Sequence, residues 1–466
     1  MPGNSVRLLR DAAENYPAWM EAIRSARQCI HFETYVVHAD SIGRQFADLL
    51  AAKAREGITV RVIYDWFGAL GSAPFLFWHR LRKAGVQVRC FHPPRLDDPF
   101  ESLRRDHRKI ITVDGRIGFV SGLCVGDDWV GDERRGIAPW RDTGLQIEGP
   151  AVAELDRAFR RVWNSVGAED AIKPPGHAHS NPAGSVALRI VTGEPGTGGL
   201  YRLDLLLSAT ARSSIWLTDA YFYATPAYVQ SLRAAALDGV DVRLLVPRTS
   251  DIPIVRALSR IGYRSLLEAG VRIFEWNGTM LHAKTAVVDE RWSRVGSTNL
   301  NIASWMGNYE LDVVIEDDEF ASSMRQMYLD DLSNATEIVL HEGSKVRPTL
   351  PRRTQRRRHR RARVSMGRAA TGVAAIGSTA GAALTRSRLL GPAEAPTMMT
   401  GALALVALGT LILFFPHQTV ITVAACCGWL AFVLCLKAFR LHRAHSRHPK
   451  PTYNYKQVSG GTHSGP

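Results

Sequence analysis

Short β-rich runs alternate with helix-like stretches over the first 340 residues of the chain. Ser41–Arg55 and Pro226–Asp238 show helical periodicity, and each ends near a glycine that precedes the next apolar run. Runs such as Gly57–Ile63, rich in β-branched residues, are typical of strands. This alternation predicts an α/β fold with a largely buried sheet.

The same pattern occurs twice, at an offset of about 180 residues. We therefore expect two halves, residues 1–172 and 186–340, joined by a Pro-rich linker at 173–185. Three segments of the first half have counterparts in the second, in the same order: Ile30–Tyr35 and Ile215–Tyr221, Gly57–Ile63 and Gly239–Leu245, Ala84–Val88 and Ala269–Ile273.

The character of the chain changes after residue 340. A basic linker, 341–392, contains the arginine run Arg352–Arg363. Within 393–440, the charge-free stretches Met398–Phe415 and Thr419–Leu436 are each 18 residues long, or about 27 Å as a helix. They predict a transmembrane helical hairpin, with a pair of buried core helices as the alternative. A basic and polar tail, 441–466, follows.

The net charge of +14 belongs to this C-terminal part. Residues 344–466 hold 19 Lys and Arg against one acid, whereas residues 1–343 hold 39 against 43. Cations on both sides of the hairpin place both its ends, and the first 340 residues, in the cytoplasm. The run Arg352–Arg363 suits anionic lipid better than nucleic acid, because it adjoins the apolar stretches and the rest of the chain is acidic.

The six cysteines form neither a CxxC pair nor a zinc-type spacing, and they indicate a reducing compartment. The N-terminus has no apolar stretch typical of a secretory signal. We expect no metal and no cofactor, since no His/Asp/Glu cluster with metal-ligand spacing stands out.

The candidate chemistry is a His-x-Lys-x4-Asp motif in each half. In an extended strand, His and Lys two residues apart project to one face. Two such pairs form a pocket for a phosphodiester, in which one imidazole attacks phosphorus, the other transfers protons, and the ammonium groups neutralise oxygen charge. The motif residues are His107, Lys109 and Asp114 in the first half, and His282, Lys284 and Asp289 in the second.

These motifs resemble the double HKD signature of the phospholipase D superfamily over roughly residues 5–340. The segments that resemble its cardiolipin synthase branch are Glu33–Tyr35, Pro139–Asp142, Gly149–Pro150, Gly296–Asn299 and Asn308–Glu310. The resemblance implies two mixed sheets flanked by helices, with one active site shared by the halves. It also implies that Asp114 and Asp289 are mainly structural.

The resemblance further implies that Asp142 and Glu310 orient the histidines, although Glu310 could equally be an ordinary carboxylate at a strand start. It implies substrate-phosphate contacts by Asn299, with Ser297 beside it in the same segment. The position equivalent to Asn299 in the first half is Cys124, and a thiol is a weak donor. Ser121 or a nearby backbone N–H could compensate. By analogy we assign the attack on phosphorus to His107 and the acid role to His282.

We expect cardiolipin synthesis from phosphatidylglycerol through a phosphohistidine, at the bacterial inner membrane. The alternatives are a hydrolytic phospholipase D, which releases phosphatidic acid, and a transfer like that of a phosphatidylserine synthase. A nuclease suits the acidic catalytic part less well. The alternative that is not an enzyme is a membrane-bound scaffold protein with an inactive site.

Overall fold

A computed structural model of the chain describes residues 1–94, 104–167, 172, 181–341, 345–348, 429 and 432. The chain divides into two compact units, residues 1–94 with 100–401, and residues 95–99 with 402–466. Because the second unit contributes only Trp429 and Phe432 to the described residues, the fold below is that of the first unit. The predicted basic run at 352–363, the tail at 441–466 and nearly all of the predicted hairpin at 393–440 lie outside the described residues. No helix in the described ranges is both long and apolar enough to cross a bilayer.

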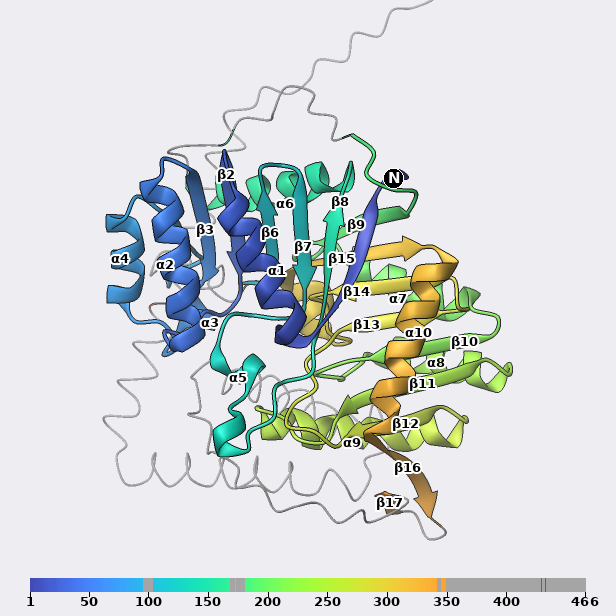
Figure 1. Ribbon diagram of the computed structural model, residues 1–466. Helices are drawn as coiled ribbons and strands as arrows, with labels where there is room; N and C mark the ends of the chain where they lie inside the picture. The colour runs from blue at the N-terminus through green and yellow to red at the C-terminus, as the bar shows by residue number, and fades with distance from the viewer. Residues whose placement is uncertain are drawn as a thin grey trace, which may run out of the picture. The chain divides into compact units, whose positions relative to one another are not determined.

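The first half folds around a seven-stranded mixed sheet, coloured blue to teal in Figure 1. The strands β2, β3 and β4 at one side of the sheet run parallel, and the strands on the other side of β2 are antiparallel to their neighbours. In spatial order the strands are β1 (Ser5–Arg10), β8 (Thr143–Glu148), β7 (Ile117–Ser121), β6 (Ile110–Val113), β2 (Cys29–Thr34), β3 (Thr59–Asp65) and β4 (Gln87–Phe91).

The second half repeats this order strand for strand in a ten-stranded sheet. The repeat predicted from the sequence is therefore confirmed in three dimensions. Two C-terminal strands and the short β5 of the first half extend this sheet. The strands are β9 (Ala187–Gly193), β15 (Asn308–Glu316), β14 (Trp292–Gly296), β13 (Thr285–Val288), β10 (Ser214–Thr218), β11 (Asp241–Pro247) and β12 (Arg272–Trp276), with β16 (Ala335–His341), β17 (Lys345–Pro348) and β5 (Arg105–Asp106).

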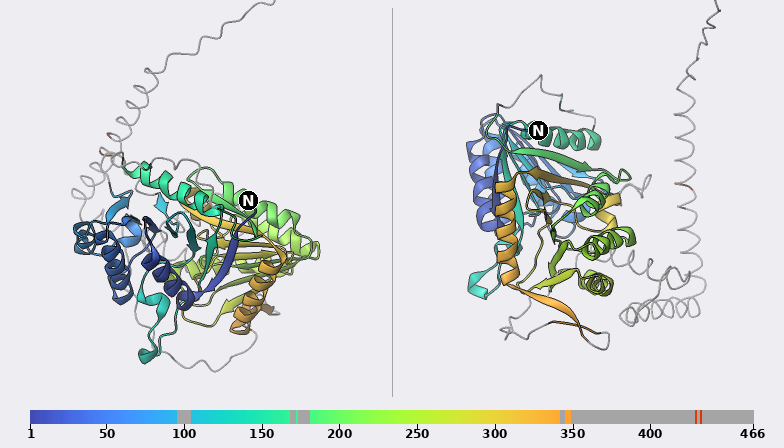
Figure 2. Two further views of the ribbon diagram at one scale, coloured as in Figure 1. Left: turned by 45° about the horizontal axis from the view of Figure 1, so that its top comes forward. Right: turned by 90° about the vertical axis from the view of Figure 1, so that its right-hand side faces the viewer.

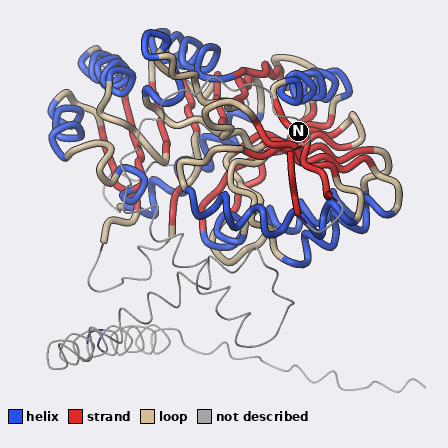
Figure 3. Tube along the Cα trace, turned by 90° about the horizontal axis from the view of Figure 1, so that it is seen from below, coloured by secondary structure: helices blue, strands red, loops and turns tan. Residues whose placement is uncertain are grey.

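Helices lie on both sides of the strands, as Figures 2 and 3 show. One core joins the first sheet to α1, α2 and α4, and another joins the second sheet to α7, α8 and α9. A third core contains side chains of both sheets together with α6 and α10, so the two halves share a buried interior. The helices are α1 (Asp11–Ser25), α2 (Ser41–Arg55), α3 (Trp66–Ala69), α4 (Phe75–Lys83), α5 (Asp127–Val130), α6 (Ala151–Val166), α7 (Gly199–Thr210), α8 (Pro226–Leu237), α9 (Pro253–Glu268) and α10 (Asp318–Ser333), with short turns η2 (Glu133–Arg135) and η3 (Ala303–Gly307).

The local sequence accounts for where the repeated helices begin and end. The side chain of Thr225 caps α8 by accepting a hydrogen bond from the Tyr228 N–H, and Pro226 occupies the first turn. Gly57 and Gly239 follow α2 and α8 with φ of +87° and +91°, a conformation that favours glycine. The predicted helices over Ser41–Arg55 and Pro226–Asp238 are thus observed, the second ending one residue earlier.

Candidate active site

The two motifs occupy equivalent places in the two sheets. His107 lies just before β6 and His282 just before β13. Each histidine therefore sits where its strand begins, beside the carboxyl end of the adjacent antiparallel strand, β2 or β10. All four side chains are buried: His107 is 8% exposed, His282 5%, Lys109 4% and Lys284 1%. The halves therefore bring two imidazoles and two ammonium groups into a largely desolvated region.

Each histidine is held by a carboxylate of the other half. His107 Nδ1 lies 3.0 Å from Glu310 Oε2, and His282 Nδ1 lies 2.7 Å from Asp142 Oδ2. Both carboxylates are fully buried. Because Nδ1 is engaged in each ring, Nε2 is the nitrogen available for chemistry.

Backbone pairing across the halves sets this arrangement. The His107 N–H donates to the Tyr309 carbonyl at 2.9 Å, where β5 pairs with β15. The His282 N–H donates to the Arg141 carbonyl at 2.7 Å, beside an isolated bridge between Arg141 and Leu281. In both places the accepting residue directly precedes the carboxylate residue, so the backbone register carries each carboxylate to the opposite histidine.

The lysines have matching environments. Lys109 and Lys284 each donate to the backbone carbonyl of the histidine two residues earlier. The Lys109 ammonium lies 5.3 Å from the centre of the Tyr35 ring, and the Lys284 ammonium lies 5.7 Å from that of Tyr221. The aromatic rings thus stabilise the buried cations without neutralising them.

Burial and neighbouring cations lower the pKa values of both histidines and of Lys284. Burial, with the charge of Lys284 next, lowers the pKa of His282 to about 4, and burial likewise lowers the pKa of His107. Burial, opposed by Asp142 and reinforced by Lys109, lowers the pKa of Lys284 to about 8. Both imidazoles are therefore neutral at neutral pH before substrate binds. The described part of the chain has no group of three or more side chains suited to hold a metal ion.

The orienting carboxylates each receive a second donor, from different residue types. Ser297 Oγ donates to Glu310 Oε2 at 2.5 Å, the oxygen that His107 contacts. In the other half, Trp129 Nε1 donates to Asp142 Oδ2 at 3.2 Å, the oxygen that His282 contacts. Trp129 could not be predicted from the sequence, because it belongs to none of the motif segments and approaches Asp142 only in the folded chain.

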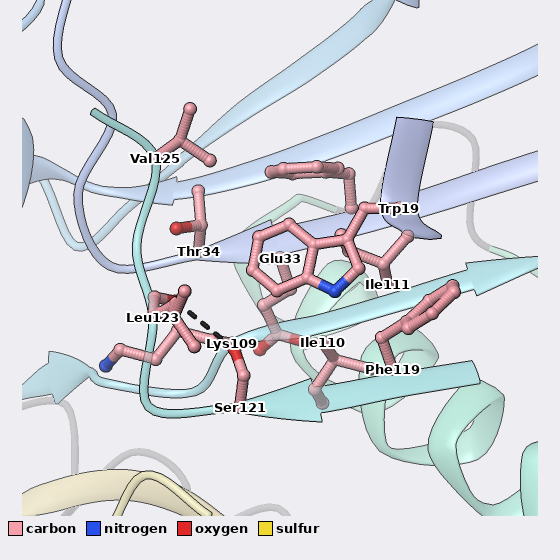
Figure 4. A pocket seen from close by; sticks show the side chains of 11 residues that line it. Trp19, Glu33, Thr34, Lys109, Ile110, Ile111, Phe119, Ser121, Leu123 and Val125 are labelled. Atoms are coloured by element: carbon pink, nitrogen blue, oxygen red, sulfur yellow. Dashed lines mark hydrogen bonds between the residues drawn. The ribbon is translucent and has the colours of Figure 1, made fainter. Parts of the chain in front are cut away.

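Ser121, named above as a possible substitute for the missing amide, forms a hydrogen bond within its own loop. Its hydroxyl donates to the Leu123 carbonyl at 3.4 Å. Figure 4 shows this bond as a dashed line, with Ser121 beside Lys109 around a small pocket that also contains Trp19 and Phe119. Ser121 therefore does not do for Asp142 what Ser297 does for Glu310.

The rings around the two imidazoles also differ. Tyr35 meets the His107 ring edge to face with centroids 4.9 Å apart. The His282 ring has three aromatic neighbours, with the ring centroids of Trp129 and Trp140 at 5.7 Å and that of Tyr221 at 5.9 Å. The His282 side is the more aromatic of the two half-sites.

The two half-sites also differ at the equivalent positions 299 and 124, which hold an asparagine and a cysteine. Asn299 is 4% exposed, and its Oδ1 has no hydrogen-bond partner among the described residues. Cys124 is 2% exposed, and burial raises the pKa of its thiol. The positive charges of Lys109 and Lys284 both act on that thiol, which places Cys124 beside the cations.

The motif aspartates bond to backbone amides and not to the histidines. Asp114 accepts from the backbone N–H groups of Arg27, Gln28 and Cys29 at 2.8–2.9 Å, and so anchors the start of β2. Asp289 accepts from three backbone N–H groups at residues 212–214, before and at the start of β10. The structure thus places both at the far ends of β6 and β13, away from the imidazoles.

Comparison with known proteins agrees with this geometry. The family model described as "Cardiolipin synthase, PLD-like domain" matches residues 19–163 and 204–332. Cardiolipin synthase A of Pseudomonas fluorescens is 36% identical over 352 residues, which cover 74% of this chain and 72% of that protein. A cardiolipin synthase of Staphylococcus aureus is 33% identical over 347 residues, covering 72% and 68%.

Among solved structures, a phosphatidylserine synthase of Haemophilus influenzae has a similar fold, with a TM-score of 0.57 and 15% identity. The similarity covers 71% of this chain and 87% of that one. The segments matched by the family model, residues 19–163 and 204–332, include both His-Lys pairs, the carboxylates that contact the histidines, and Asn299. The chain therefore belongs to the cardiolipin synthase family of PLD-like domain proteins.

Proposed function

We propose that this protein is a cardiolipin synthase that transfers a phosphatidyl group between two phosphatidylglycerol molecules. The observation that carries the proposal is the pairing of His107 with Glu310 and of His282 with Asp142, each across the two halves. A buried lysine accompanies each histidine. The names of the relatives supply the lipid substrate.

In the first step, His107 Nε2 attacks phosphorus and forms a phosphohistidine. The bond from phosphorus to the glycerol oxygen breaks, and His282 donates a proton to that oxygen so that glycerol leaves. The bound phosphodiester anion raises the low pKa of His282 and so allows it to carry this proton.

In the second step, the terminal hydroxyl of another phosphatidylglycerol gives its proton to His282 and attacks the phosphohistidine. The phosphorus–nitrogen bond breaks and cardiolipin is released. Lys109 and Lys284 stabilise negative charge on the non-bridging oxygens in both steps, and the Asn299 amide contributes a hydrogen bond to the same group.

Water competes with the second alcohol, and the outcome depends on how dry the site is. The buried histidines and the aromatic rings around His282 favour transfer over hydrolysis. We further propose that residues 393–440 form a membrane hairpin that tethers the catalytic halves, 1–172 and 186–340, on the cytoplasmic side of the bacterial inner membrane. Its two charge-free stretches and their basic flanks support this.

The test is to reconstitute the full chain with phosphatidylglycerol and identify the products. Cardiolipin with an equal amount of glycerol supports the synthase. Phosphatidic acid without cardiolipin indicates a hydrolase, phosphatidylserine formed from a CDP-lipid and serine indicates the other transferase, and no turnover contradicts the enzyme.

The roles of the histidines are tested separately with His107→Ala and His282→Ala. We expect His282→Ala to accumulate a covalent phosphatidyl adduct and His107→Ala to form none. Adduct on the His107→Ala protein would reverse the assignment.

A further inference from the structure

We infer that the outer face of α4 docks onto the surface of a bilayer that contains anionic phospholipid, beside the active site. We call this face the α4 patch, and it consists of Phe75, Leu76, His79, Arg80 and Lys83. The inference rests on the proposed function only in that the substrate is a lipid.

The apolar part of the α4 patch is conspicuously exposed. Phe75 is 74% and Leu76 66% exposed, whereas Trp78 and Leu81 on the other side of the helix are 3% exposed. The Trp78 ring stacks on Tyr64 at 3.8 Å and fixes the helix orientation. Two adjacent large apolar side chains in the first turn of a firmly packed helix are surplus to the core and suit an interface.

The rest of the α4 patch is cationic. Helical spacing puts His79, Arg80 and Lys83 on the face of Phe75 and Leu76, and all three are exposed. Residues 75–83 include no acid, and no described carboxylate pairs with Arg80 or Lys83. Apolar side chains next to unpaired cations match the acyl boundary and head groups of anionic lipid.

The loop before α4 connects the patch to the active site. Gly68 approaches Tyr35 so closely that a Cβ atom there would lie 2.1 Å from the Tyr35 carbonyl oxygen. The Ser72 carbonyl accepts from the Ala39 N–H at 2.9 Å, and the Tyr35 ring contacts His107. The loop that leads into α4 thus contacts the segment that follows β2, the strand whose carboxyl end lies beside His107.

The second half also exposes apolar side chains beside its site residues. Ile302 is 50% and Met306 39% exposed, and both follow Asn299 by only a few residues. A bilayer that contacts such segments would bring lipid head groups to a site whose histidines are themselves almost fully buried. Residues 344–466 hold 19 Lys and Arg against one acid, so the chain's own C-terminal part is a poor electrostatic match for these cations. A second copy of the chain is distinguished from lipid by the crosslinking experiment.

The occupant of the patch can be identified by photocrosslinking. The full chain, carrying benzoylphenylalanine in place of Phe75, is reconstituted in vesicles of phosphatidylglycerol and phosphatidylcholine and irradiated. We expect lipid adducts on α4. The matched control carries the probe in place of Leu237, which is 70% exposed but lies at the end of α8, just before β11 begins and so at the end of the second sheet away from His282. This control should give few adducts. Adducts to residues 349–466 or to a second copy, or equal lipid labelling at both positions, would overturn the inference.

Activity gives an independent test. The double variant Phe75→Asp/Leu76→Asp should lose at least about tenfold of its activity on vesicle phosphatidylglycerol. It should keep its activity on short-chain phosphatidylglycerol below the micelle concentration, and Leu237→Asp should change neither. Unchanged vesicle activity, or equal loss on both substrates, contradicts docking. If the unmodified chain turns over neither lipid, the proposed function fails, while the crosslinking still decides the docking.

Discussion

The carboxylates that contact the two histidines are supported by different kinds of donor from non-equivalent positions. Glu310 is supported by the hydroxyl of Ser297, whereas Asp142 is supported by the indole N–H of Trp129. Because the indole also contacts the His282 ring, the support of the carboxylate and the packing of the imidazole are coupled on one side only.

We expect Trp129→Phe to reduce kcat/KM about fivefold, the equivalent of one net hydrogen bond of about 1 kcal/mol. Loss of the N–H donor makes Asp142 a stronger partner for an imidazolium, so the pKa of His282 should rise. An NMR titration of His282 measures this. Trp140→Phe is the control, since the Trp140 ring lies equally close to His282 but has no described bond to Asp142. A similar shift in both variants would argue against a specific role for the indole N–H.

The difference between the equivalent positions Asn299 and Cys124 gives a second prediction. Asn299→Ala should lower kcat about a hundredfold, as expected for a lost donor to the reacting phosphate. Cys124→Ala should change kcat by less than roughly threefold, because a thiol is a weak donor. Steady-state assays on both variants decide the matter, and equal losses would show that the half-sites contribute alike.

Segments that cross between the halves hold the site together. The Arg141 guanidinium, on the segment that pairs with Leu281, donates to Asp331 of α10 at 2.8 Å and to Asp11 of α1 at 3.1 Å. One buried cation thus ties a helix of each half to the backbone that precedes Asp142. Geometry at His282 therefore depends on contacts that belong to neither half alone.

Replacing this cation should affect both stability and activity. We expect Arg141→Met to lower the free energy of unfolding by about 3 kcal/mol, because Asp331 stays buried and Arg10 is then its one remaining ion-pair partner among the described residues. Arg10→Met, which removes a side chain that is 37% exposed, should cost less than about 1 kcal/mol. Denaturant unfolding compares the two, and equal costs would mean that the Arg141 network is not the main link.

At the scale of the whole molecule, two halves place like charges in one buried region. The charge of Lys109 acts on Lys284 and on His282, although these belong to opposite halves. The titration of the site is accordingly a property of the assembled chain.

This coupling predicts the alkaline limb of the pH profile. Lys284 is charged below its pKa of about 8 and neutral above it, so kcat/KM for an anionic lipid should fall above pH 8, approaching tenfold per pH unit. The limb of kcat should lie at higher pH, because bound phosphate favours the cation. In Lys284→Arg the fall in kcat/KM above pH 8 should disappear, because arginine stays charged there. This expectation holds even if the substitution lowers the maximal rate. A limb unchanged by that substitution would assign it to another group.

Much of this protein could be predicted from the chain alone. Strand and helix periodicity with the glycines at helix ends determined the α/β repeat, because these are local properties of the backbone. The spacing of His107 and Lys109, and of His282 and Lys284, determined which side chains share a face of an extended segment.

The tertiary structure decided how the half-sites are completed. The carboxylate that His282 contacts lies 140 positions away in the sequence, and the one that His107 contacts lies 203 positions away. The indole of Trp129, which no motif indicated, supports Asp142. No periodicity encodes such partners, because they depend on the register of β5 against β15 and of Arg141 against Leu281. Sequence determined the reacting groups, and the packing of one half against the other decided their orientation and their charge.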